Sequence, residues 1–174
     1  MAELADRLAR GDPAAFAELY DACAAALHHW LLLQLRSAND ADDVVQETFV
    51  RLARSRKKLR RVENPVAYAF TVARNEAARL QRRRVRKPRG EAELPALASV
   101  DDASAEREAV DAVRAALERL PKEQREIVEL KAYAGLTLRE IAEVTSLPPG
   151  TVATRYRAAL GRLRQWLIKS ECHE

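Results

Sequence analysis

Apolar residues recur every three or four positions along most of the chain, which is the spacing of one face of an α-helix. Asp12 and Pro13 predict the start of a long helix, because aspartate caps a helix and proline suits its first turn. The predicted buried stripe of this helix is Phe16, Leu19, Tyr20, Cys23, Leu27, Trp30 and Leu31. No run of alternating β-branched residues is long enough to predict a strand. The predicted fold class is all-α.

Two more helices are predicted before the periodic pattern ends. Asn39 or Asp40 is expected to cap the first, and Asn64 with Pro65 is expected to open the second. The inward positions predicted for these two helices are Val45, Phe49 and Leu52, and then Val66, Phe70, Ala73 and Ala77. Together the three helices predict a first domain over residues 12–87.

The helical pattern is lost over residues 88–104, where two prolines and a glycine interrupt it and the chain turns acidic. This composition predicts a flexible linker. Helical spacing resumes over residues 105–170, which predict a second domain. The buried positions expected in its first two helices are Val110, Val113, Leu117, Ile127, Val128 and Leu130. The predicted architecture is two small helical domains joined by an acidic linker.

The second domain contains the pattern of a helix-turn-helix. Thr137 and Glu140 have capping-box spacing, Gly135 suits the end of the preceding helix, and Pro149 suits the start of the following one. The inward positions are Leu138, Ile141 and Val144 in the short helix, and Val152, Tyr156, Leu160, Leu163 and Leu167 in the long one. The second helix of such a unit enters the DNA major groove. Its predicted outward residues are Thr151, Thr154, Arg155 and Arg157.

Charge is distributed unevenly, although the net charge is only +4. Residues 51–90 contain 15 of the 30 lysines and arginines and only two acids, whereas residues 91–118 contain eight acids and two arginines. A basic block of this density is typical of a phosphate-binding surface, and solvated helix faces are also often basic. The separate helix-turn-helix in the same chain favours nucleic acid.

Other classes of protein lack support in the sequence. The N-terminal segment has no apolar core, and no stretch approaches the ~20 apolar residues of a membrane helix, so we expect a cytoplasmic protein without membrane insertion. Cys23 and Cys172 lack metal-type spacing, and the adjacent His28 and His29 point in different directions on a helix. No phosphate loop or nucleophile elbow is present. We therefore expect no catalytic residue, no metal and no enzyme activity.

The helix from Asp40 to Leu52 has an outward face of mixed chemistry, made by Asp43, Gln46, Glu47 and Val50. Its carboxylates would repel DNA phosphate. Val50 could make an apolar contact with a protein partner while the charges set the register. From spacing alone, a protein-docking face and a solvated face fit equally well.

Three segments together resemble the extracytoplasmic-function (ECF) sigma factors of bacterial RNA polymerase, a group of the sigma-70 family. The resemblance runs from Phe16 to Leu167. Its segments are DADDVVQETFVRLAR, NPVAYAFTVARNEAARLQRRR and LERLPKEQREIVELKAYAGLTLREIAEVTSLPPGTVATRYRAALGRLR. It implies a region 2-like domain, a region 4-like domain, and a function in promoter-specific transcription initiation.

The resemblance also implies partners and roles for single residues. Asp43, Gln46, Glu47 and Val50 would dock on the clamp helices of the largest subunit of core RNA polymerase. The residues implied in binding and opening the minus-ten element of promoter DNA are Arg60, Arg61, Asn64, Tyr68, Arg74, Asn75, Arg82, Arg83 and Arg84. Thr151, Thr154, Arg155 and Arg157 would read the minus-thirty-five element. An anti-sigma factor is the expected inhibitor, and no cofactor is implied.

The chain departs from the usual family pattern at Tyr68-Ala69, where a tryptophan-leucine pair is common, and at Arg79, where aspartate is common. Ala153 and Tyr156 also replace residues that are commonly lysine and leucine. Two alternatives stay open. One is a stand-alone helix-turn-helix transcription regulator. The other is a protein whose first domain serves mainly to dock another regulator.

Overall fold

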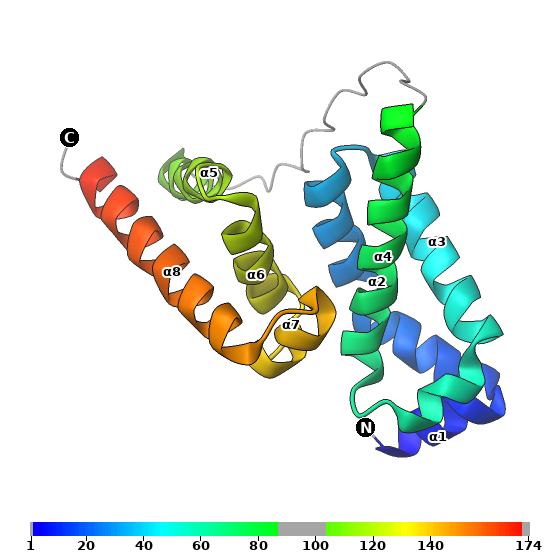
Figure 1. The fold of residues 1–174 in the computed structure, drawn as a ribbon. Coiled ribbons are helices and arrows are strands. Elements are labelled where there is room, and N and C mark those ends of the chain that lie inside the picture. The colour runs from blue at the N-terminus through cyan, green and yellow to red at the C-terminus, as the bar shows by residue number, and fades with distance from the viewer. Residues whose placement is uncertain (1, 87–103, 172–174) are drawn as a thin grey trace. The chain divides into compact units, whose positions relative to one another are not determined.

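The computed structural model describes residues 2–86 and 104–171, and within these residues every regular element is a helix (Figure 1). The all-α prediction is therefore confirmed. The elements are α1 (Ala2–Arg10), α2 (Pro13–Leu35), α3 (Ala38–Arg54), the 3-10 helix η1 (Arg56–Arg61), α4 (Pro65–Arg86), α5 (Ser104–Glu118), α6 (Lys122–Tyr133), α7 (Leu138–Thr145) and α8 (Pro149–Glu171).

The chain forms two compact units, and each is described by itself. The first contains α1 to α4, and the second contains α5, α6, α8 and most of α7. The predicted linker, residues 88–104, lies outside the described residues except for Ser104, which begins α5. No helix in the described part of the chain is long and apolar enough to cross a membrane.

Side-chain caps fix where the helices of the first unit begin. Asp12 Oδ1 accepts a hydrogen bond from the Ala14 N–H at 2.9 Å, as predicted for the start of α2. Asn64 Oδ1 accepts from the amides of the next turn and opens α4. The cap predicted for α3 at Asn39 or Asp40 is wrong, because Ser37 caps this helix and its Oγ accepts from the Asp40 N–H at 3.3 Å.

In the first unit, α2, α3 and α4 pack against one another and α1 lies along η1. At the centre, Trp30 and Phe70 are fully buried and meet edge to face at 5.8 Å between ring centroids. Cys23 is part of this core, as predicted; burial raises the pKa of its thiol to about 12, so it stays protonated. Helix α1 has no counterpart among the predicted elements, yet it buries Leu4 and Leu8.

Four predicted core positions of the first unit lie at its edge. Tyr20 is 50% exposed, and Phe16, Phe49 and Val66 are half-buried. The rings of Tyr20 and Phe49 pack together at 4.9 Å between centroids. The inward side of α3 is instead completed by Val44 and by Thr48, whose hydroxyl donates to the Val44 carbonyl oxygen. The apolar stripe of α3 is thus rotated slightly from the one that the sequence predicts.

In the second unit, α8 packs against α5 and α6. The predicted capping box is present: the Thr137 N–H donates to Glu140 Oε2 at 2.7 Å, and the Glu140 N–H donates to Thr137 Oγ1 at 3.2 Å. Gly135 has the left-handed conformation expected after α6, with a φ of 64°. Ser146 takes a similar φ of 56° in the turn between α7 and α8. The local geometry of a helix-turn-helix is thereby complete.

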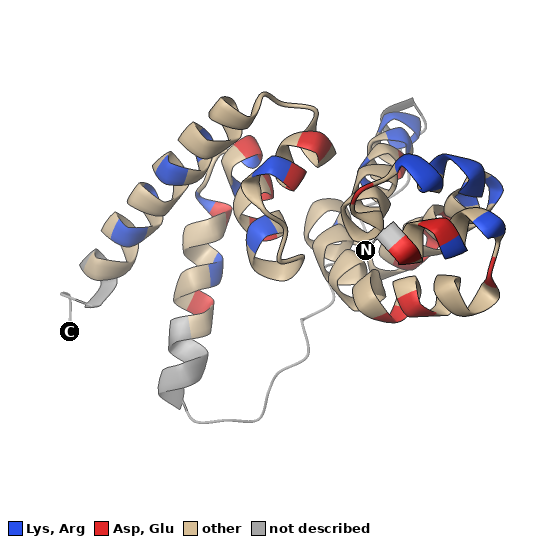
Figure 2. Cartoon of the chain, turned by 90° about the horizontal axis from the view of Figure 1, so that it is seen from below, with Lys and Arg blue, Asp and Glu red and all other residues tan. Residues whose placement is uncertain are grey.

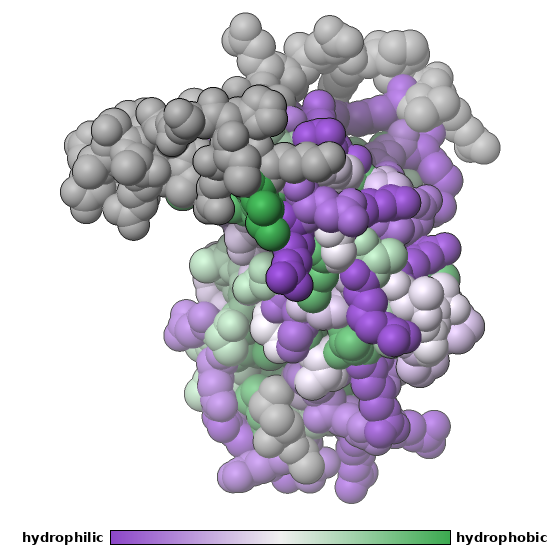
Figure 3. Space-filling view, turned by 90° about the vertical axis from the view of Figure 1, so that its left-hand side faces the viewer, coloured by the Kyte–Doolittle hydropathy of each residue, from purple (hydrophilic) through white to green (hydrophobic). Residues whose placement is uncertain are grey.

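Three apolar positions predicted to be buried in the second unit are exposed. Val110 and Val113 on α5 are 55% and 44% exposed, and Leu160 on α8 is 43% exposed. Val152 is buried in α8 as predicted, and Ala159, which was not predicted, is buried there as well. Viewed from the side of α8, the surface carries separate hydrophobic spots among hydrophilic side chains (Figure 3).

Candidate functional site

The predicted protein-docking face on α3 is present as one surface. Asp43 and Gln46 are exposed, Val50 is 41% exposed, and Glu47 is half-buried. They lie together because Val44, Val45, Thr48 and Leu52 turn the opposite side of α3 into the core. All four docking residues line a hollow of about 600 Å³ between α3 and α4. The face is therefore bounded on one side by a second helix.

A charged bridge fixes the geometry of this hollow. The Arg51 guanidinium donates through Nε to Glu47 Oε1 at 2.8 Å, and its Nη1 lies 3.0 Å from Glu76 Oε1 on α4. The Glu76 side chain is only 11% exposed, so this contact is less screened by solvent than an ordinary surface pair. Arg51 thus joins α3 to α4 and holds the Glu47 carboxylate at the edge of the hollow. No signal in the sequence singles out Arg51 or Glu76 for this position.

The basic block predicted from composition is concentrated on η1 and α4 (Figure 2). Five of the six residues of η1 are lysine or arginine and all five are exposed, while the buried Leu59 anchors the helix. Arg60 and Arg61 belong to this cluster and line a second hollow, of about 520 Å³, with residues of α1. Arg60 Nε lies 3.4 Å from Asp6 Oδ1, and its side chain remains 77% exposed.

The outward side of α4 carries the other predicted minus-ten residues. Tyr68 is half-buried, and Asn75 and Arg82 are exposed. These three positions are seven residues apart, about two helical turns, so they follow one side of α4. Arg74 is half-buried beside them, and Asn64 is the cap at the start of the helix. A single strand of nucleic acid would meet one aromatic ring followed by polar and basic side chains.

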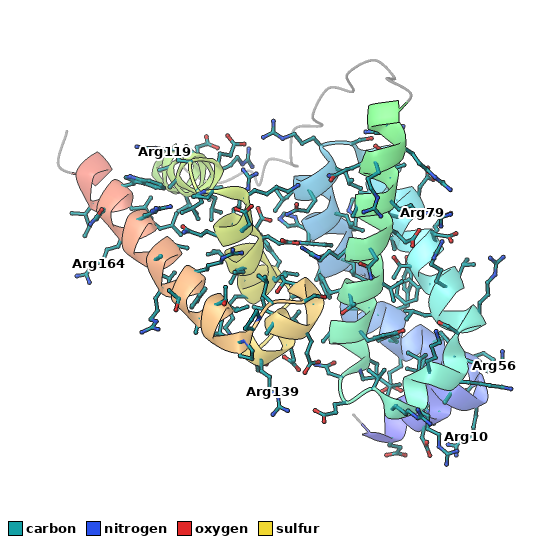
Figure 4. The ribbon with its side chains drawn as sticks, in the orientation of Figure 1. Arg10, Arg56, Arg79, Arg119, Arg139 and Arg164 are labelled. Carbon is teal, nitrogen blue, oxygen red and sulfur yellow. The ribbon has the colours of Figure 1, made fainter. Side chains whose placement is uncertain are left out.

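The arginine run at the end of α4 does not form one surface. Arg82 is exposed, Arg83 lines the hollow between α3 and α4, and Arg84 forms an ion pair with Asp40 at the start of α3. Arg79 also lines this hollow, with its Nη1 3.8 Å from Glu76 Oε2 (Figure 4). Arg79, one of the departures from the usual family pattern, therefore lies next to the docking face of α3.

In the second unit, the predicted base-reading residues lie in the first two turns of α8. Thr154 and Arg157 are exposed, and Thr151 and Arg155 are half-buried. Arg157 Nε donates to the Ala153 carbonyl oxygen at 3.3 Å, which holds the side chain along the helix. Arg139 on α7 and Arg164 near the end of α8 are exposed as well (Figure 4). The unit therefore presents threonine and arginine at the part of α8 that would enter a groove.

No group of three or more histidine, cysteine or carboxylate side chains in the described ranges could hold a metal ion.

The sequence profile of Sigma-70 region 2 matches residues 19–87, and that of Sigma-70, region 4 matches residues 111–163. The ECF RNA polymerase sigma factor RpoE of Cereibacter sphaeroides is 32% identical over 160 residues, covering 88% of this chain and 87% of that protein. The chain belongs to the ECF RNA polymerase sigma factors.

Other ECF sigma factors match over similar lengths. SigM of Mycobacterium tuberculosis is 31% identical over 166 residues, covering 95% of this chain and 84% of SigM. Among solved structures, CnrH in complex with the cytosolic domain of CnrY has a TM-score of 0.70 and 25% identity, covering 97% of both chains. The sigma factor RpoE from Bartonella quintana, solved with the anti-sigma factor NepR, shares the fold at a TM-score of 0.70 and 24% identity.

The two family regions divide the candidate residues of this ECF sigma factor. The region 2 match contains the docking face of α3, the basic residues of η1 and all of α4. The region 4 match begins within α5 and includes the helix-turn-helix with the start of α8. Helix α1 precedes the region 2 match, although it contributes Asp6 to the surface around Arg60. The sequence-based prediction did not include Asp6 as an acidic partner of η1, because it did not assign a helix to residues 2–10.

Proposed function

We propose that this ECF sigma factor binds core RNA polymerase through α3 and directs it to promoters whose DNA the two units recognise and open. The observation that carries this proposal is the presence of both sigma regions in one chain, each with its own surface. Sigma factors initiate transcription without catalysing a reaction, so we propose no enzyme activity. Because core polymerase acts on the chromosome, we propose that the protein works in the cytoplasm.

Polymerase docking is proposed to rest on Asp43, Gln46, Glu47 and Val50. An exposed valine within a ring of charged and polar side chains is typical of a protein interface, where apolar contact supplies affinity and charges set the register. The same carboxylates would repel DNA. The proposed partner surface is the pair of clamp helices in the largest polymerase subunit.

Promoter opening is proposed to use the outward side of α4. Unpaired bases stack on aromatic rings while cations hold the backbone of the strand. Tyr68 supplies the ring, and Asn75 and Arg82 continue the same side of the helix. Arg60, Arg61 and Arg74 would hold phosphates nearby, and Asn64 would act at the start of α4. Since Arg84 is paired with Asp40, its contribution would be to orient α4.

Recognition of the minus-thirty-five element is proposed to use the start of α8. Arginine forms paired hydrogen bonds with guanine, and threonine can bond a base edge or contact a thymine methyl group. Thr151, Thr154, Arg155 and Arg157 are the side chains in position for such contacts. Contacts from other basic residues to phosphate would fix the register without reading sequence.

We also propose that an anti-sigma factor binds this protein and blocks its access to polymerase. Support comes from CnrH, which matches the chain over nearly its whole length and whose structure holds the cytosolic domain of CnrY. The chemistry of the proposed inhibitor follows from the docking face, because it would have to cover the exposed Val50 and satisfy the surrounding charges.

The test is a pull-down of purified core RNA polymerase with the wild-type chain and a Glu47→Lys, Val50→Asp double variant. We expect the wild type to bind and the variant to lose binding, because a lysine at position 47 would reverse a charge of the interface and a carboxylate at position 50 would replace its apolar contact. Asp21→Lys is the matched control, since it reverses an exposed charge on α2 away from the hollow. Absence of binding by the wild type would overturn the proposed function.

A further inference from the structure

The hollow between α3 and α4 has two chemically different walls. The wall from α3 carries the carboxylates of Asp43 and Glu47, and the wall from α4 carries the guanidinium groups of Arg79 and Arg83. Apolar side chains lie between these charges, contributed by Val44, Val50 and Leu80. At about 600 Å³ the hollow has room for several side chains of a partner. Its surface is therefore mixed in charge and partly apolar.

The two arginines that α4 contributes to the hollow differ in how they are paired. Arg79 forms a long ion pair with Glu76, at 3.8 Å, and the other carboxylate oxygen of Glu76 is held by Arg51 at 3.0 Å. Arg83 is exposed and forms no ion pair with any side chain that the structure describes. Arg83 is thus available to a carboxylate from outside, and Arg79, with its side chain 47% exposed, can bind one in addition to its long contact with Glu76.

DNA is a poor occupant of this hollow because the carboxylates of Asp43 and Glu47 stand on its opposite wall. A phosphate that approached Arg83 would also approach these acids, and repulsion would offset much of the attraction. A protein helix has no such conflict, since it can present acidic side chains to α4 and basic or amide side chains to α3. Apolar side chains of the same helix would meet Val50 and Leu80.

We propose that the α3–α4 hollow binds a helix of core RNA polymerase, and that Arg79 and Arg83 bind carboxylates of that helix. This inference rests on the proposed function and extends the docking face from one helix to two. It also moves Arg83 from the DNA-binding set to the polymerase-binding set. Arg51 also lines the hollow and acts as a positioning residue, because it holds the two walls together.

Arg82 and Arg83 provide a matched pair of variants for the test. They are adjacent, both are exposed, and both change charge equally in Arg82→Glu and Arg83→Glu. Binding of each full-length variant to core polymerase is measured by fluorescence anisotropy. We expect Arg83→Glu to weaken binding at least about tenfold, since like charges juxtaposed across an interface are strongly unfavourable. Arg82→Glu should bind polymerase within about twofold of the wild type, as expected for a charge outside the interface.

Single-stranded DNA binding by the free chain gives the second readout, and there the order should reverse. Arg82→Glu should weaken DNA binding more than Arg83→Glu does. Thermal unfolding of both variants establishes that each is folded. Polymerase binding by Arg83→Glu that is no weaker than binding by Arg82→Glu overturns the inference, while loss in Glu47→Lys, Val50→Asp would still support the proposed function. Failure of the wild type itself to bind would overturn both.

Discussion

Asn64 has an observed role as a helix cap and a proposed role in DNA binding, and variants of this one residue can separate the two. Its side-chain oxygen accepts hydrogen bonds from the Val66 N–H at 2.9 Å and the Ala67 N–H at 3.3 Å, which caps α4. It is also among the residues proposed to act on the minus-ten element. Any loss of DNA binding in an Asn64 variant could thus come from an altered helix start or from a lost contact.

Asn64→Ala and Asn64→Asp distinguish these roles. The alanine variant loses the cap and should be destabilised by about 1 kcal/mol, the usual cost of such a loss. The aspartate variant keeps a capping oxygen and should retain near wild-type stability, but its negative charge should weaken DNA binding. Urea unfolding and anisotropy with single-stranded DNA measure the two effects. Unchanged DNA affinity in a fully stable Asn64→Asp variant would exclude this residue from the DNA surface.

Individual caps were predictable where one residue of the right type stood alone before a helix. Asp12, Asn64 and Thr137 are such cases. The cap of α3 was not predictable in this way, because Ser37, Asn39 and Asp40 are all good capping residues within four positions. The choice depends on where α2 ends. Arg36 takes a left-handed φ of 53° there, and α3 begins two residues later.

At the scale of whole elements, periodicity predicted the existence of α2, α3, α4 and the helix-turn-helix but not the phase of each helix. Tyr20 and Leu160 belong to apolar stripes by spacing, yet neighbouring elements leave both exposed. The same limit applies to Arg82, Arg83 and Arg84. Their consecutive positions indicate one basic run, whereas the direction of each depends on how α4 packs against α3.

Helix α8 offers a comparison of two arginines on one element. Arg155 lies in its second turn, where base contacts are proposed, and Arg164 lies more than two turns farther along. Arg155→Ala should reduce binding of holoenzyme to its promoter by about 1–3 kcal/mol, the range for a lost base contact, with a smaller loss on unrelated DNA. Arg164→Ala should reduce both similarly and weakly, as a phosphate contact would.

Anisotropy of both holoenzyme variants on promoter and scrambled duplexes provides the measurement. Equal losses for Arg155→Ala on the two duplexes would mean that Arg155 contacts only phosphate. Because Arg155 is half-buried, the unfolding midpoint of the variant must also be compared with that of Arg164→Ala. A difference in promoter preference at matched stability would assign the effect to recognition.

At the scale of the whole molecule, charge alone gives attraction to DNA without much choice of sequence. The basic surface of η1 and α4 and the few side chains at the start of α8 belong to separate units. The proposed base-reading side chains are few in each unit, so we expect neither unit to select a site alone. Core polymerase would hold both units over their elements at once, so the second contact forms at a high effective concentration.

The free chain should therefore bind a promoter no more than about tenfold more tightly than a scrambled duplex. Its holoenzyme should bind the promoter at least about 1,000-fold more tightly than the scrambled duplex, which is the lower end for specific complexes. The promoter is first selected from random DNA with holoenzyme, and both ratios are then measured at one salt concentration because electrostatic binding depends on salt. The Glu47→Lys, Val50→Asp variant mixed with core polymerase should behave like the free chain. If the free wild-type chain bound the promoter a thousandfold more tightly than the scrambled duplex, the protein would instead be a stand-alone helix-turn-helix regulator. Its two units would then select a site without being held together by polymerase.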